Sequence, residues 1–151
     1  MSRFAFVAAL ACLGALSACD GDGVGRYPAP LDLPSASVVE LRTTAPVPGR
    51  YNVEATVVKI TRCYCPPDVF CAPCLFADGV VVSETGAPFP ESDADSLDAA
   101  GYLHVAAEDP EQFERGGRYL LSVSVESRSE GVDGSAPPIV WTDLLGYGRA
   151  E

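Results

Sequence analysis

Residues 118–126, RYLLSVSVE, contain the clearest structural signal in the chain. Apolar and polar side chains alternate along this stretch, which is the pattern of a β-strand with one buried and one exposed face. We therefore predict a strand here. Its buried face consists of Tyr119, Leu121, Val123 and Val125, and its exposed face consists of Ser122, Ser124 and Glu126.

Four other segments show strand patterns. Residues 50–61, RYNVEATVVKIT, alternate until the doublet Val57-Val58, after which apolar character moves to the other face at Ile60. A β-bulge or a strand shared between two sheets would produce such a change. The remaining strands are predicted at 79–83, 102–107 and 139–145, and the core is predicted to contain Val53, Val57, Leu121, Val123 and Trp141.

A helical pattern is found between the third and fourth of these strands. Residues 109–115 read DPEQFER, in which Asp109 is a suitable N-cap and Pro110 suits the first helical position. The pair Gly116-Gly117 then predicts the end of the helix. No other amphipathic helix of useful length is expected.

This order of elements, with a long first strand and one short helix before strand four, resembles the OB-fold over roughly residues 48–148. The expected fold class is therefore mostly β, a small five-stranded OB-like barrel with one short helix, and the alternative is a small β-sandwich. OB-folds often bind oligonucleotides or oligosaccharides on strands two and three. A fold does not determine a ligand, so the resemblance alone assigns none.

The N-terminus has the composition of a secretory signal. Arg3 is followed by an apolar run of small residues that is too short to cross a bilayer as a helix. Leu16-Ser17-Ala18-Cys19 resembles the lipobox of bacterial lipoproteins, which implies lipidation of Cys19 and removal of residues 1–18. An ordinary signal peptide cut nearby and an uncut anchor are the alternatives.

The predicted organisation has three parts: a signal peptide at 1–18, a lipid anchor and Gly/Pro-rich tether at 19–37, and an OB-like β domain at 38–151. The predicted location is the cell envelope, with the domain facing the periplasm or the exterior. Asp20 resembles an inner-membrane retention signal, so we favour the inner membrane.

The charge of the chain limits its partners. Ten Lys and Arg residues stand against 21 Asp and Glu residues, which gives a net charge of −11. Such a surface repels phosphate backbones and suits cations or basic partners, so we expect no nucleic-acid binding. The expected partners are the membrane, through lipid on Cys19, and an envelope protein or a saccharide.

Four cysteines occur in the loop after the first predicted strand, in CYCPPDVFCAPC at 63–74. In an oxidising compartment thiols tend to pair, so disulfides are favoured. Because a Cys63–Cys65 bridge would be strained, the crossed pairing and the nested pairing, Cys63–Cys74 with Cys65–Cys71, remain.

Two other functions of this cluster stay open. Four thiolates can surround one zinc or copper ion, which would make Cys63, Cys65, Cys71 and Cys74 metal ligands. The segment Phe70-Cys71-Ala72-Pro73-Cys74 resembles a thioredoxin-type redox centre, although no helix pattern follows it.

Other candidate chemistry is sparse. His104 is the only histidine, so no catalytic pair forms around it, and the alternation places it on the surface. The acidic run Glu91-Asp93-Asp95-Asp98 lacks the glycine of a calcium loop and is interpreted as solvated. We therefore expect no enzyme activity and no cofactor.

Overall fold

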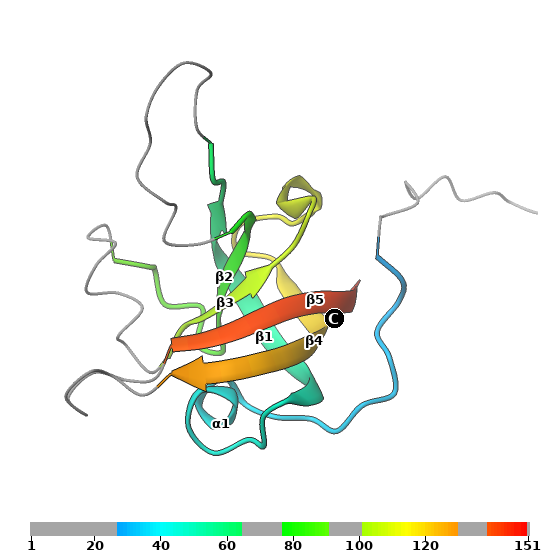
Figure 1. The fold of residues 1–151 in the computed structure, drawn as a ribbon. Coiled ribbons are helices and arrows are strands. Elements are labelled where there is room, and N and C mark those ends of the chain that lie inside the picture. The colour runs from blue at the N-terminus through cyan, green and yellow to red at the C-terminus, as the bar shows by residue number, and fades with distance from the viewer. Residues whose placement is uncertain (1–26, 65–76, 91–100, 130–138, 151) are drawn as a thin grey trace, which may run out of the picture.

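The computed structural model describes residues 27–64, 77–90, 101–129 and 139–150. They form a closed five-stranded barrel in which the strands neighbour one another in the order β1-β2-β3-β5-β4 (Figure 1). All pairs are antiparallel except β3 with β5. The predicted OB-like fold class is confirmed, because a closed barrel excludes a sandwich of two separate sheets. The strands are β1 (Gly49–Thr61), β2 (Gly79–Ser83), β3 (Leu103–Ala106), β4 (Arg118–Ser129) and β5 (Ile139–Arg149).

The long first strand contains the predicted bulge. Val57 is opposite Val82 and Lys59 is opposite Val81, so Val58 is the extra residue on β1. The extra residue turns Val58 to the outside of the barrel, where it packs with Val81 and Tyr102 in a small second cluster. The bulge lets β1 bend and pair with both β2 and β4, which closes the barrel.

Valine is the most frequent residue in the barrel interior, which also contains leucine, alanine and tyrosine side chains. The predicted inner face of β4 is confirmed, since all four of its apolar residues are at most 4% exposed. Trp141 was predicted to be in the core, and this is wrong: it is 51% exposed. Along β5 the buried positions are instead Val140, Thr142 and Leu144. The main buried set is Val53, Ala55, Val57, Val80, Val82, Leu103, Val105, Tyr119, Leu121, Val123, Val125, Val140 and Leu144.

A short helix that the sequence analysis missed covers one end of the barrel. α1 (Val38–Thr43) begins with a capping box in which the Ser37 hydroxyl accepts from the Glu40 N–H and the Glu40 carboxylate accepts from the Ser37 N–H. Leu41 is fully buried in the barrel core. At the other end of the helix, the Arg128 guanidinium donates to the carbonyls of Leu41 and Ala45.

The helical pattern after β3 forms only a single 3-10 turn, η1 (Pro110–Gln112). Pro110 is in the first turn as predicted, but the Asp109 side chain makes no capping hydrogen bond. Gly116 has a φ of 86°, a backbone conformation that favours glycine, and its N–H donates to the Val57 carbonyl. Phe113, just after the turn, packs edge-on against Tyr119 inside the barrel.

Residues 27–37, which we call the strap, run along the outside of the barrel to α1 (Figure 1). The predicted flexible tether covered this segment, and the structure differs: Ser35 forms a parallel bridge with Asn52 of β1. The Asn52 side chain donates to the carbonyls of Leu31 and Leu33. The strap therefore belongs to the folded domain.

Two contacts of the strap explain why Ser122 is buried and why residue 146 is glycine. The Ser122 hydroxyl accepts from the Leu31 N–H and donates to Asn52 Oδ1, so Ser122 is fully buried instead of exposed as predicted. The strap also crosses β5 at Gly146, where a Cβ atom would lie 2.8 Å from the Ala29 carbonyl oxygen. Glycine therefore permits this close approach.

Within the described ranges, no helix combines the length and the apolar composition that a membrane span requires.

Candidate functional site

A groove of about 760 Å³ opens along the seam between β3 and β5. The seam is short because β3 has four residues and pairs with β5 only at Ala106, opposite Asp143. One further bond crosses it, from the Thr142 hydroxyl to the His104 carbonyl. The groove is lined by Tyr27, Ala77, Asp78, Ala106, Ala107, Glu108, Asp143 and Leu144.

The strap forms one border of this groove. The Tyr27 hydroxyl accepts from the Glu108 N–H at 2.8 Å, and the Pro28 carbonyl accepts from the Tyr147 N–H of β5. Beyond Asp143, the edge of β5 is thus paired with the strap instead of with β3. The groove lies along the edge of β5, between the part that pairs with β3 and the part that pairs with the strap.

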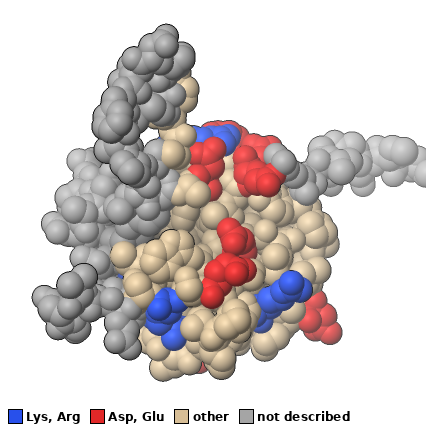
Figure 2. Space-filling model, in the orientation of Figure 1, with Lys and Arg blue, Asp and Glu red and all other residues tan. Residues whose placement is uncertain are grey.

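Carboxylates dominate the polar side chains of the groove and of the adjoining face. Burial raises the pKa of Asp143 above its usual value, and the negative charge of Glu126 on β4 raises it further. The Glu126 carboxylate accepts a hydrogen bond from Ser124, which lies opposite Asp143 in the sheet. Figure 2 shows acidic side chains in the middle of the viewed face, over the region of β4 and β5.

Trp141 lies on this outer face, two residues from Asp143 on the same strand. Alternate residues of a strand point to the same side, so the indole and the carboxylate are neighbours on one surface. Trp141 is the only tryptophan of the chain and is half exposed. Trp141 was predicted to be in the core and was therefore not predicted to be a site residue. Val140, Thr142 and Leu144 also alternate along this strand. If they are taken as the buried face, Trp141 is predicted to be exposed.

A second cluster holds the base of the cysteine-containing loop. The Arg62 guanidinium forms ion pairs with Asp78 at 2.9 Å and with Glu111 at 3.0 Å. The other oxygen of Asp78 accepts from the Cys63 N–H at 2.6 Å. The Cys63 N–H and Arg62 lower the pKa of Asp78. These contacts join the two described ends of the loop to each other and to η1.

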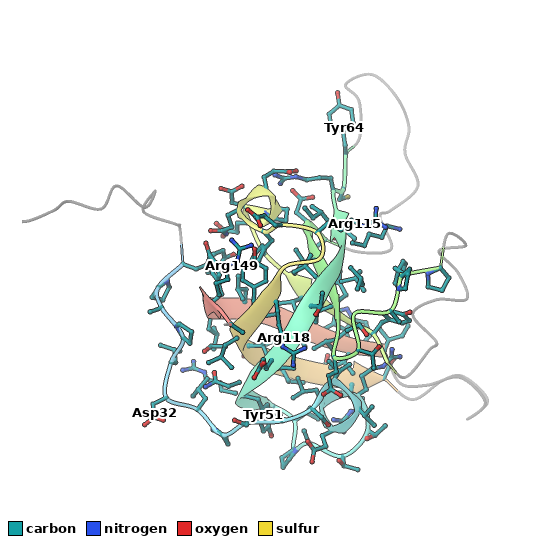
Figure 3. All side chains as sticks on the ribbon, turned by 180° about the vertical axis from the view of Figure 1, so that it is seen from behind. Asp32, Tyr51, Tyr64, Arg115, Arg118 and Arg149 are labelled. Carbon is teal, nitrogen blue, oxygen red and sulfur yellow. The ribbon has the colours of Figure 1, made fainter. Side chains whose placement is uncertain are left out.

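The predicted cysteine site lies mostly outside the described residues. Cys63 is described and is disulfide-bonded, whereas Cys65, Cys71, Cys74 and the predicted lipidation site Cys19 are not described. The predicted pairing and the alternative metal site therefore stay predictions. Tyr64 is 75% exposed and points away from the barrel (Figure 3).

His104 was predicted to be a plain surface residue, and the structure differs. The ring faces outward from β3 but is half-buried, and its Nε2 atom lies 3.1 Å from the Thr61 hydroxyl. Burial lowers its pKa to about 4, against an opposing hydrogen bond with the Ala77 backbone. The imidazole is thus neutral at physiological pH and joins the ends of β1 and β3 beneath the loop base.

Among the described residues, no group of three or more His, Cys, Asp or Glu side chains is arranged to hold a metal ion. The acidic run Glu91-Asp93-Asp95-Asp98 falls outside these residues. The groove offers carboxylates, a tyrosine and backbone carbonyls, which suit noncovalent binding.

A comparison of the chain with protein-family models, curated proteins and solved structures finds no match.

Proposed function

We propose that this protein is a lipid-anchored binding module of the bacterial cell envelope. Cys19 carries the lipid, and the barrel presents the groove between β3 and β5, beside Trp141, to an envelope protein or a saccharide. The β domain itself is the recognition element. The described end of the cysteine loop, at Ala77 and Asp78, lines the groove. The domain acts by holding its partner and not by transforming it.

The observation that supports binding most strongly is the groove itself. Its volume of about 760 Å³ lies within the roughly 300–1,000 Å³ typical of ligand sites. A half-exposed tryptophan lies beside it, and aromatic side chains are enriched where proteins bind partners. The lipobox-like Leu16–Cys19 supports the anchor.

Site-specific photo-cross-linking in the envelope tests this proposal. A photoreactive phenylalanine analogue replaces Trp141 in one variant and Asp32 of the strap in the other. Asp32 points away from the barrel and does not line the groove (Figure 3). We expect a discrete adduct from position 141 and none from position 32. Absence of an adduct at 141, or equal adducts at both positions, contradicts a binding groove.

Anchoring has a separate test. Cys19→Ala should block lipidation and leave an unprocessed precursor that still contains residues 1–18. The variant is compared with the parent chain by intact mass and by detergent partitioning. If the variant matures to the parent's size and partitions in the same way, the lipobox interpretation is wrong.

The second candidate function is a metal-handling or thiol-redox lipoprotein that uses Cys63, Cys65, Cys71 and Cys74. The disulfide at Cys63 favours a loop closed by disulfides over this alternative. Thiol counting on non-reduced protein distinguishes them, because two bridges leave no reactive thiol whereas a metal site releases four after chelation. Bound zinc or copper at one equivalent per chain would support the alternative.

A further inference from the structure

We propose that the groove between β3 and β5 binds a basic peptide segment of the partner protein, with a lysine or arginine side chain that pairs with Asp143 and lies against Trp141. The inference rests on the proposed function and narrows it to one chemical class of partner.

Asp143 and Glu126 differ from many carboxylates of the barrel in having no arginine partner. Elsewhere the described carboxylates commonly pair with arginine, as in Glu54–Arg118 and Glu114–Arg149. Within the described part of the chain, the Asp143 side chain has neither a hydrogen bond nor an ion pair, and Glu126 accepts only from the Ser124 hydroxyl. The two carboxylates thus share one face and form no ion pair there, although the exposed Arg50 of β1 is opposite Ser124 on the same face.

Two like charges on a partly desolvated surface repel each other, and the raised pKa of Asp143 reflects its burial first and this repulsion second. A bound ammonium or guanidinium group would relieve the repulsion, whereas a neutral sugar would leave it in place. A net charge of −11 attracts a cationic partner from a distance as well.

Trp141 offers a second attraction for a cation on this face. The face of an indole attracts a cation that lies within about 6 Å of the ring centroid. An exposed indole two residues from an unpaired carboxylate therefore offers both interactions that a lysine or arginine side chain uses. The adjoining groove, with Ala106, Ala107 and Leu144 in its walls, is large enough for several residues of extended peptide.

The test uses the processed protein in a nonionic detergent and octalysine as the probe. Trp141 is the only tryptophan, so its fluorescence reports directly on this face. We expect octalysine to change the emission with saturation and octaglutamate and cellotetraose to leave it unchanged. Absence of a response to octalysine at millimolar concentration and low salt, or a response to cellotetraose instead, overturns the proposal.

Matched charge variants separate a defined site from general attraction to an acidic protein. Asp143→Asn and Asp32→Asn each remove one negative charge, but only Asp143 lines the groove. Loss of one partly desolvated ion pair should weaken octalysine binding about fivefold in Asp143→Asn, and Asp32→Asn should bind nearly as the parent does. Equal weakening in both variants overturns the proposal.

Weaker octalysine binding by Asp143→Asn is not expected to come from loss of folding. Because the pKa of Asp143 is raised in the folded protein, its ionised form opposes folding at neutral pH, and Asp143→Asn should melt no lower than the parent. The proposed function and this inference fail in different experiments. An adduct at position 141 without octalysine binding means that the module binds a partner of other chemistry. Absence of an adduct at position 141 contradicts the binding function itself.

Discussion

The two ends of the barrel are held together by different interactions. At the α1 end, Leu41 is buried in the core and Arg128 donates to the last carbonyls of the helix. At the η1 end, the loop that contains Cys63 is held from outside, by ion pairs of Arg62 with Asp78 and Glu111. Apolar burial stabilises the fold strongly, whereas exposed ion pairs contribute little. The ion pairs of Arg62 therefore position a loop and add little to stability, whereas Leu41 at the α1 end and Phe113 beside η1 are buried in the core.

The largest expected effect tests the α1 end. Leu41→Ala removes a fully buried side chain and should lower the free energy of unfolding by about 2 to 5 kcal/mol. Denaturant unfolding followed by circular dichroism measures this change. Val39→Ala is the matched control, because Val39 is on the same helix and is exposed. If both variants lose the same small amount, α1 does not close the core.

An intermediate effect concerns His104 near the η1 end. Its pKa is lowered in the fold to about 4 from an ordinary 6.5, so protonation favours the unfolded chain. The stability that comes from the neutral ring is complete above about pH 6.5. It is lost as the pH falls toward 4, and it amounts to at most about 3 to 4 kcal/mol because each pKa unit corresponds to about 1.4 kcal/mol.

Melting curves of the parent and of His104→Gln between pH 7 and pH 4 measure this loss. The glutamine variant should lose less stability over this range than the parent does, since the carboxylates titrate alike in both proteins. Parallel pH dependence in the two proteins would show that the ring is not responsible.

The smallest expected effect concerns Arg62. Its ion pairs are exposed, so Arg62→Ala should change the melting temperature only slightly. The loop base should nevertheless loosen, which amide hydrogen exchange at Cys63 and Asp78 measures. Arg118→Ala, which breaks an exposed pair with Glu54 far from the loop, is the control. A large loss of stability in Arg62→Ala would mean that both ends support the fold equally.

The strands could be predicted from the sequence because alternation along one segment determines which residues face the core. This reasoning succeeded for β4 and for the bulge at Val58, and it failed for Trp141. Apolar residues occupy both faces of the start of β5, with Ile139 and Trp141 on one and Val140 on the other. The choice depends on pairing with β4, where Thr142 is opposite Val125, and this register is not visible in one segment.

The candidate site was largely beyond prediction for a similar reason. The groove exists because β3 is short and the strap occupies the edge of β5, which brings together residues far apart in the chain, such as Tyr27 and Asp143. Helix α1, with six residues, is too short to show a helical period, although Ser37 and Glu40 have the spacing of a capping box. Local sequence patterns predict strands better than they predict a groove, which depends on how distant segments meet.

The contact between Tyr27 and Glu108 has a consequence for the distance between barrel and membrane. If the lipid is on Cys19, as proposed, residues 20–26 separate the anchor from Tyr27, the first described residue, which contacts the barrel. Fully extended, this linker spans at most about 25 to 30 Å. The groove edge at Tyr27 is then within about one bilayer thickness of the headgroups. A partner that is held at the same membrane surface is therefore within reach of the groove.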